Sequence, residues 1–220
     1  FMDTYNPETV FSSIDHHGRY SYVNQPVIAQ WNLFRLAETL LPLIHNKKDK
    51  AIEIAEEAIN NFNVVYKKYW LEMMRKKLGL FGEENEDENL INDLLSWMHQ
   101  NKSDFTNIFC SMIKKDFLND HQFQDSIFLS WHQRWKTRLE KNNIPMELSL
   151  NLMRNTNPLI IPRNHKVEEA LNAASEDDNL KPMHNLLEVL KKPYEERSEI
   201  TVYQTPPTPS EYVYKTFCGT

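Results

Sequence analysis

The chain has 220 residues, 40% of them hydrophobic, which is enough to bury a substantial core in one large domain or two small ones. Its 25 basic and 31 acidic residues give a net charge of −6, which disfavours binding to nucleic acid or to an anionic membrane. Only four glycines occur, too few for a dinucleotide-binding fingerprint or a phosphate-binding P-loop. The two cysteines exclude a disulfide framework and a zinc site built on four thiolates.

No apolar run approaches the ~20 residues needed to cross a bilayer, and the start of the sequence lacks the basic and apolar regions of a signal peptide. We therefore expect an intracellular protein. Because the first residue is Phe1 rather than methionine, we also expect the sequence to be part of something longer, or its start to have been removed.

The first predicted helix runs from about Pro26 to Ile44, with Asn24 as its cap and Pro26 in its first turn. Its apolar residues recur at helical spacing: Val27, Ile28, Trp31, Phe34, Leu40 and Leu41. Between Lys50 and Leu78 we predict one long helix that ends at Gly79. A single continuous buried stripe is expected along it: Ile52, Ala55, Ile59, Phe62, Tyr66, Tyr69 and Met73.

The acidic run EENEDE, residues 83–88, is predicted to be a solvated loop that leads into a helix N-terminus. A calcium site is the disfavoured alternative, because the glycine and the closing glutamate of an EF-hand loop are absent. Further helices are expected over the apolar patterns of residues 90–98, 105–113 and 127–135. From Asn157 a Pro-marked extended segment leads into two short helices, the first capped near Asn164, and beyond Pro193 a Pro-rich tail is expected to be extended. No β-sheet pattern occurs, so the fold class is mainly α.

The string Asp15-His16-His17 also occurs in metal-dependent phosphoesterases, whose acids and histidines hold two metal ions. We reject that interpretation, because such sites need further aspartates at strand ends. The other histidines are scattered and form no H-E-x-x-H zinc pattern. Trp131 and Trp135 share one helix face and are predicted to be core residues rather than a stacking platform.

The two cysteines lie in different surroundings. Cys110 is on an apolar helix face and is predicted to be a structural residue. Cys218, two residues from the end of the chain, is either a redox group or incidentally exposed. From the residues alone, the chain is a mainly helical body without a self-sufficient catalytic constellation.

Three separated blocks of the sequence stand out: the opening FMDTYNPETVFSSIDHHGRYSYVNQPVIAQWNLFRLAETLLPLI, then NPLIIPRNHKVEEAL with LLEVLKKPYEER, and the ending PP followed by YKTFCGT. Together they resemble the selenoprotein O family, called YdiU in bacteria. Their order and spacing cover nearly all 220 residues.

The resemblance implies a protein-kinase-like fold that transfers AMP from ATP to hydroxyl side chains of protein substrates, with Mg or Mn. In this family the metal-binding aspartate lies in a D-Y-G-P-F-G-F-M-D motif, and the chain opens at its last three letters, Phe1, Met2 and Asp3. The catalytic, nucleotide-binding and metal-binding residues are therefore expected in a preceding N-terminal half. The chain itself is expected to hold no catalytic or metal site and no cofactor, and to be inactive alone. The expected location is a bacterial cytoplasm, and a mitochondrial location is the alternative for a eukaryotic member.

Under this resemblance, residues 1–25 are an activation-segment-like loop, 26–192 a helical, kinase-like C-lobe body, and 193–220 an extended C-terminal tail. The activation-segment residues would be Asp15, Arg19, Tyr20 and Asn24, with Arg19 and Asn24 as hydrogen-bonding residues that fix the segment. Cys218 would be the family's near-terminal redox residue, but the place of its cysteine partner reads Phe11-Ser12, so no intramolecular latch is expected. The rival hypothesis is a complete, non-catalytic helical scaffold or interaction module.

Overall fold

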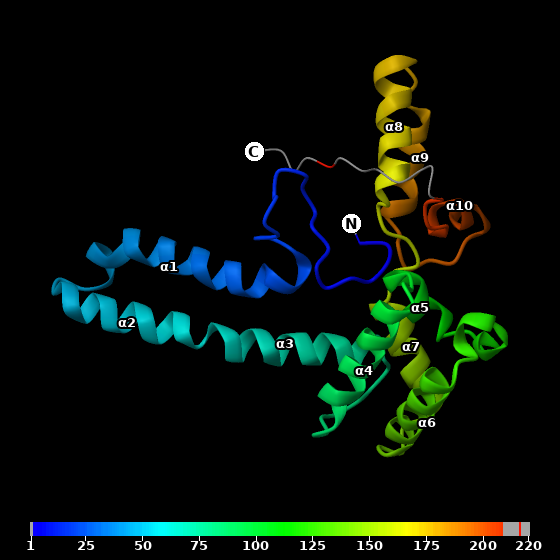
Figure 1. The fold of residues 1–220 in the computed structure, drawn as a ribbon, viewed down its shortest axis with the longest axis horizontal. Helices are drawn as coiled ribbons and strands as arrows, with labels where there is room; N and C mark the ends of the chain where they lie inside the picture. Colours follow the sequence, from blue (N-terminus) through cyan, green and yellow to red (C-terminus); the bar gives the residue numbers. More distant parts are fainter. Residues whose placement is uncertain (1, 209–215, 217–220) are drawn as a thin grey trace. The chain divides into compact units, whose positions relative to one another are not determined.

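The computed structural model describes residues 2–208 and residue 216. Within them the chain forms ten α-helices and four short 3-10 helices, and no β-strand (Figure 1). A single antiparallel bridge joins Thr4 to Asp104. The prediction of a mainly α fold is thus confirmed. Across these residues, no helix is both long and apolar enough to span a membrane.

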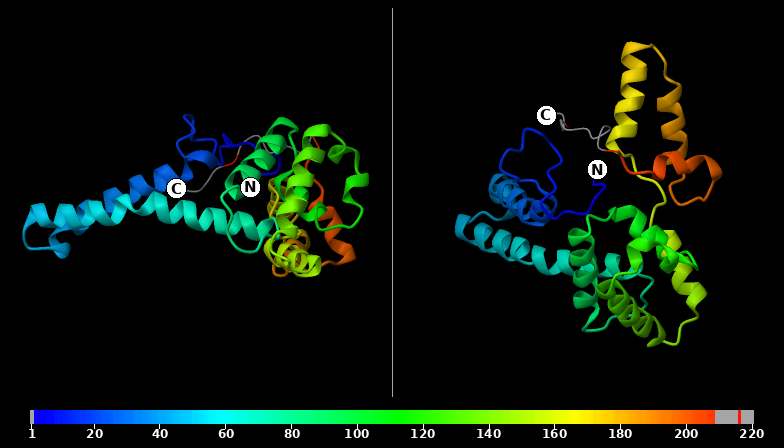
Figure 2. Two further views of the ribbon diagram at one scale, coloured as in Figure 1. Left: turned by 90° about the horizontal axis from the view of Figure 1, so that it is seen from below. Right: turned by 45° about the vertical axis from the view of Figure 1, so that its right-hand side comes forward.

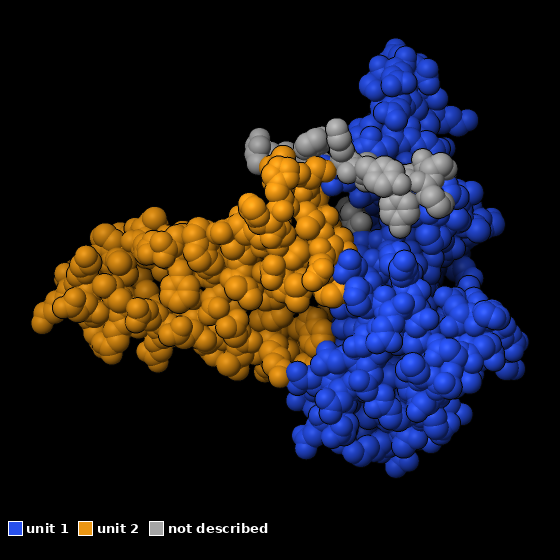
Figure 3. Space-filling view, viewed as in Figure 1, with its two compact units in different colours: residues 1–6, 74–216 blue, residues 7–73, 217–220 orange. Residues whose placement is uncertain are grey.

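The chain divides into two compact units, which Figure 3 shows in different colours. Among the described residues, the larger unit contains 2–6, 74–208 and 216, and the smaller unit contains 7–73.

The smaller unit consists of a loop followed by helices α1 (Gln25–Ile44), α2 (Lys48–Asn60) and most of α3 (Phe62–Lys77). Helices α1 and α2 lie side by side in Figures 1 and 2, joined by a three-residue turn. The predicted first helix is confirmed. Asn24 precedes it at the capping position but makes no capping bond, since its backbone is in the helical region rather than the extended region typical of a cap. Its side-chain amide donates to the carbonyl of Gly18 at 2.8 Å.

The single long helix predicted between Lys50 and Leu78 is divided at Asn61 into α2 and α3. The prediction of one continuous buried stripe along it was also wrong. On α2, Ala55 and Ile59 are buried, whereas on α3 the side chain of Tyr69 is 63% exposed and that of Met73 40%. The difference arises because α1 packs on α2, while the corresponding face of α3 lies open in the described structure.

The larger unit contains α4 (Asp87–Gln100), α5 (Phe105–Ser111), α6 (Ser126–Glu140) and α7 (Met146–Thr156). Two 3-10 turns, Phe117–Asn119 and His121–Phe123, connect α5 to α6. Trp131 and Trp135 are 2% and 3% exposed and stack with ring centroids 6.0 Å apart, which confirms that they are core residues. Their indole N–H groups donate to the carbonyls of Leu90 and Leu78, so neither buries an unpaired donor.

Helices α8 (Asn164–Glu176) and α9 (Lys181–Leu190) form a hairpin, visible in Figures 1 and 2. Residues that were expected to begin an extended tail pack against this hairpin. Ser198–Ile200 form a 3-10 turn and Thr201–Gln204 form α10. The chain turns here because Ile200, 2% exposed, enters the hydrophobic cluster of the hairpin.

Candidate functional site

The loop of residues 15–24, which holds the four residues predicted for the activation segment, is closed by its own hydrogen bonds. The carboxylate of Asp15 accepts the backbone N–H groups of Arg19 and Tyr20, each at 2.8 Å. These bonds, that of Tyr20 above all, hold the pKa of Asp15 below its ordinary value. Asn24 adds the bond to Gly18 described above. The loop therefore has a defined shape set by Asp15 and Asn24.

The side chain of Arg19 contacts aromatic rings. Its guanidinium lies over the ring of Trp31, 4.4 Å from the centroid, and more loosely over Tyr20, at 5.8 Å. Arg35 approaches the same indole at 5.4 Å. The four predicted residues Asp15, Arg19, Tyr20 and Asn24 are thus brought into one loop at the start of α1, where the Tyr20 side chain stays 49% exposed. This arrangement could present a peptide-binding surface, but it offers no nucleophile paired with a base.

A second polar cluster surrounds Arg163, which directly precedes α8 and is only 1% exposed. Its guanidinium donates to both carboxylate oxygens of Asp104, at 2.7 and 3.2 Å, and to the carboxylate of Asp3. It also donates to the carbonyl of Gln204 at 2.9 Å and to Asn107 at 3.3 Å. One buried cation therefore links the start of the chain, α5, α8 and α10.

Asp3 and Asp104 are fixed by the backbone as well. The amide of Phe105 donates to the carbonyl of Asp3 at 2.8 Å, and that of Tyr5 to Ser103 at 2.9 Å. Asp104 caps α5 by accepting the N–H of Asn107, also at 2.8 Å. Burial alone would lower the pKa of Arg163, but the carboxylates of Asp104 and Asp3 outweigh it, so the pKa is raised and the residue stays charged.

Sequence reasoning singled out neither Arg163 nor Asp104. A partial signal was present, because Arg163 directly follows the apolar stretch PLIIP of a block that carried the family resemblance. A charge among residues that are expected to be buried requires a partner. Which acid supplies it cannot be read from the sequence, since Asp104 lies 59 positions away.

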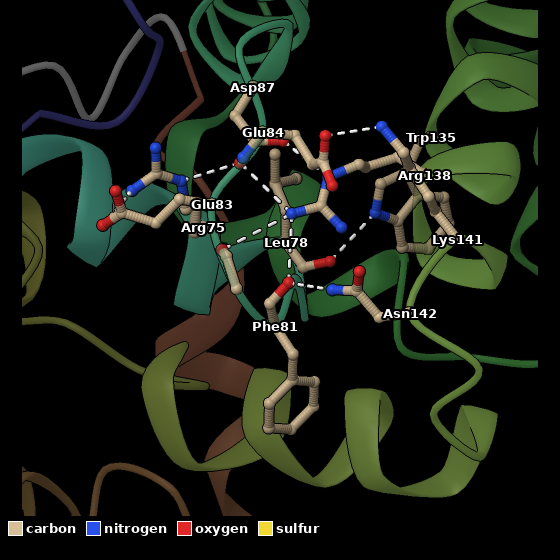
Figure 4. A network of polar contacts seen from close by, with 11 residues as sticks. Arg75, Leu78, Phe81, Glu83, Glu84, Asp87, Trp135, Arg138, Lys141 and Asn142 are labelled. Atoms are coloured by element: carbon tan, nitrogen blue, oxygen red, sulfur yellow. Dashed lines mark hydrogen bonds and ion pairs between the residues drawn. The ribbon is translucent and has the colours of Figure 1, made fainter.

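A third cluster, shown in Figure 4, surrounds Asp87, whose side chain is fully buried. Its oxygens accept from Arg75 at 2.7 Å, from Arg138 at 2.6 and 3.2 Å, and from the backbone N–H of Glu84 at 3.0 Å. Burial would raise the pKa of Asp87, but these donors outweigh it, with Arg138 foremost, so the pKa is lowered. Arg138 also donates to the carbonyl of Phe81 at 3.0 Å.

This cluster corrects the interpretation of the acidic run 83–88. The run does lead into a helix, since α4 begins at Asp87. However, Asp87 is not solvated, and it ties α4 to α3 and α6 through two arginines. Arg75, in the last turn of α3, is only 9% exposed for the same reason.

Lys77 and Cys110 form a small buried group in the larger unit. The ammonium of Lys77 lies 4.5 Å from the ring centroid of Phe109, and burial lowers the pKa of Lys77 to about 8. Cys110 is 8% exposed and donates its S–H to the carbonyl of Pro158. Burial raises the pKa of the Cys110 thiol to about 11, so it is a packing residue, as predicted. Cys218 lies outside the described residues.

The carboxylates at hand do not fit a divalent metal. Asp3, Asp104 and Asp87 are all neutralised by arginines. In the part of the chain that the structure covers, no group of three or more His, Cys, Asp or Glu side chains is arranged to hold an ion, and His16 and His17 belong to no such group. We therefore derive no chemical step through a metal.

Comparison with known proteins completes the description. The sequence profile of the family described as Protein adenylyltransferase SelO matches residues 1–191. This chain belongs to the SelO family. The predicted resemblance is thereby confirmed, and the family is one of protein nucleotidyltransferases.

Individual SelO relatives align with this chain over its whole length. It is 51% identical over 220 residues to "Protein nucleotidyltransferase YdiU" of Nitrosococcus oceani, covering 100% of this chain and 45% of that protein. The proteins of the same name from Alcanivorax borkumensis and Clostridium perfringens are 52% and 50% identical over all 220 residues, which make up 46% and 45% of their lengths. The chain thus spans slightly less than half the length of these SelO relatives and corresponds to their C-terminal part.

Proposed function

We propose that this chain is the helical, kinase-like C-lobe part of a protein adenylyltransferase that moves AMP from ATP to hydroxyl side chains of proteins. The observation that carries the proposal is the SelO match over residues 1–191, together with relatives at about half identity that are named protein nucleotidyltransferases. ATP and Mg or Mn are the proposed cofactors of the full-length protein, and its proposed location is the bacterial cytoplasm.

Within the full-length enzyme, this chain is proposed to act as the scaffold and substrate-docking part. Two observations support this. The matched region makes up only 45–46% of the length of the Nitrosococcus oceani and Alcanivorax borkumensis relatives, so more than half of each relative has no counterpart in these 220 residues. In addition, the buried carboxylates of this chain are engaged by arginines and are not free to coordinate an ion. ATP-holding and metal-holding groups are therefore assigned to the region that precedes the match, and the 220 residues alone are proposed to be inactive.

The loop of residues 15–24 is proposed to act as an activation segment that shapes the surface where a protein substrate docks. Its support is the defined conformation given by Asp15 and Asn24 and the exposed side chain of Tyr20. Cys218 is proposed as a redox group that exchanges with an external thiol. Cys110 is a poor internal partner because its thiol is buried with a pKa of about 11.

The reaction type is tested with two isotopically labelled forms of ATP and a mixture of candidate substrate proteins. The enzyme is a joined polypeptide in which the region that precedes the match in the Nitrosococcus oceani relative is fused to Phe1. Label carried at the α-phosphorus is expected to transfer to protein, and label at the γ-phosphorus is not. Transfer of the γ label would identify a kinase and overturn the proposal, and transfer of neither would favour the non-catalytic scaffold.

A further inference from the structure

We propose that the open apolar surface of α1 and α3 is the docking surface for the polypeptide that precedes the matched part in full-length SelO proteins. The inference rests on the proposed function, since it names the partner of the scaffold assigned there. All the side chains on which the proposal depends lie in the smaller unit.

Helix α1 carries the first observation. None of its 20 residues is buried, although its sequence, QPVIAQWNLFRLAETLLPLI, is one of the most apolar in the chain. The side chains of Val27, Leu36 and Leu43 are 67%, 53% and 83% exposed. A surface helix normally buries one apolar stripe and presents polar residues elsewhere. Here apolar residues also occupy the open side, as in a helix that is covered on more than one face.

Helix α3 carries the second observation. Five large apolar side chains of this helix are exposed to solvent. The exposed fractions are 68% for Val64, 40% for Tyr66 and 63% for Tyr69, and Val65 and Met73 are exposed as well. A groove of about 440 Å³ runs between α1 and the α2–α3 segment. Its lining is almost wholly apolar and includes Leu33, Leu36, Leu40, Ile59, Phe62 and Val65. The groove joins the exposed side chains of Leu36 on α1 and Val65 on α3 into one open apolar surface, and surface of this kind marks an interaction site.

The occupant is inferred from the length of the SelO relatives. More than half of each relative lies outside the match, and the match takes their C-terminal part, so in the relatives a region of domain size precedes the residue that matches Phe1, only six residues before the smaller unit begins at Pro7. A covalently attached partner is present at a high effective concentration, so even a modest affinity keeps it docked. The lining offers a partner apolar contacts and only one polar side chain, that of Asn61, which suits a permanent intramolecular interface.

The test compares hydrogen exchange in the 220-residue chain with that in the joined polypeptide described above. We expect amides of residues 25–44 to exchange at least about tenfold more slowly when the preceding region is present. Amides of α4 in the larger unit should exchange alike in both, which shows that both proteins are folded. The intact Nitrosococcus oceani relative is measured in parallel, so that a folding failure of the joined polypeptide still leaves a reading on the segment that matches α1.

Leu36→Glu supplies the second measurement. In the 220-residue chain it should leave the Tm within about 2 °C, because Leu36 is already 53% exposed. In the joined polypeptide it should abolish the added protection of α1. The matched control is Leu171→Glu on α8, where the side chain is 52% exposed and lies outside the groove; the protection should persist.

Three outcomes would overturn the inference. One is α1 exchange that is equally fast in the 220-residue chain, the joined polypeptide and the intact relative. Another is a concentration-dependent dimer of the 220-residue chain that protects α1, which would make a second copy the occupant. The third is protection that survives Leu36→Glu. AMP transfer is measured on the same samples: transfer without protection contradicts only the docking, and protection without transfer contradicts only the proposed reaction.

Discussion

Arg163 donates hydrogen bonds to both carboxylate oxygens of Asp104, and so joins the residue before α8 to the residue that caps α5. Arg163 is 1% exposed and Asp104 11%, so the pair is largely removed from water. Such a pair contributes little compared with a well-packed apolar substitute, but removing one partner leaves an uncompensated charge. The pair therefore fixes how the segments of the larger unit meet.

Replacement of Arg163 should destabilise the larger unit strongly. We expect Arg163→Met to lower the free energy of unfolding by about 3–5 kcal/mol, because Asp3 and Asp104 would remain buried without a counter-charge. Urea denaturation followed by far-UV circular dichroism measures the change. Arg154→Met is the control: its pair with Glu147 is exposed, and the loss should be below about 1 kcal/mol. Similar losses in the two variants would show that burial of Arg163 has no energetic consequence.

Asp87 should make the protein sensitive to acid. Its pKa in the folded state is lowered, so its contribution to stability is complete above the unfolded value of about 3.9 and is lost as the pH falls through the folded value. We expect Asp87→Asn to be less stable than the wild type at pH 7 and to lose less stability on acidification below pH 4. Urea midpoints measured between pH 7 and pH 3 test this. An unchanged acid slope would mean that other carboxylates dominate the transition.

The contrast between Trp131 and Asp87 shows what the sequence could predict. Trp131 and Trp135 follow helical spacing among other apolar residues, and local periodicity is enough to place them in a core. Asp87 stands among four other acids, a local pattern that favours solvent. Its burial depends on Arg138, 51 positions away, and such a pairing is decided only once the helices have packed.

The candidate site was predictable to a different extent. The hydrogen-bonding loop at residues 15–24 could be singled out from its density of polar side chains. Its closure by Asp15 is local, because the carboxylate accepts the backbone N–H groups four and five residues further along the chain. The prediction that the apolar stripe of α3 is buried was wrong for another reason. Periodicity indicates which face of a helix is apolar, but it does not indicate whether another segment covers that face.

Lys77 should make stability rise with pH under alkaline conditions. Between its folded pKa of about 8 and its unfolded value of about 10.4, the unfolded chain holds a proton that the folded chain has released, so the free energy of unfolding increases with pH. We expect Lys77→Met to be more stable than the wild type at pH 7 by about 1–3 kcal/mol, since the contact with the ring of Phe109 offsets part of the burial cost.

Cys110 acts in the opposite direction over an overlapping range. Its buried thiol keeps its proton to about pH 11, whereas the thiol of the unfolded chain ionises near 8.5, so this contribution falls as the pH rises. The quantity to compare is therefore the difference in free energy of unfolding between Lys77→Met and the wild type. This difference should shrink towards zero as the pH is raised from 7 to 10.5. Lys76→Met, at an exposed neighbour, should show a small and constant difference. A constant difference for Lys77→Met would contradict its lowered pKa.

Gly79 should tolerate no side chain. It has φ +70°, and an added Cβ would lie 2.8 Å from the carbonyl oxygen of Ser149 and 3.0 Å from Met153. Gly18 has a similar φ of +64°, but its nearest neighbours would be 3.8 Å away. We expect Gly18→Ala to cost about 1–2 kcal/mol from backbone conformation alone, and Gly79→Ala at least about 1 kcal/mol more from the clash. Equal losses in thermal denaturation would show that α3 and α7 can move apart at no cost.

The most direct test of the account is AMP transfer from α-labelled ATP by the 220-residue chain and by the joined polypeptide, measured side by side at equal concentration. The account predicts protein labelling by the joined polypeptide and none by the 220 residues alone, with or without Mg or Mn. Metal-dependent labelling by the 220-residue chain itself would contradict it, because the transferring groups would then reside within these helices.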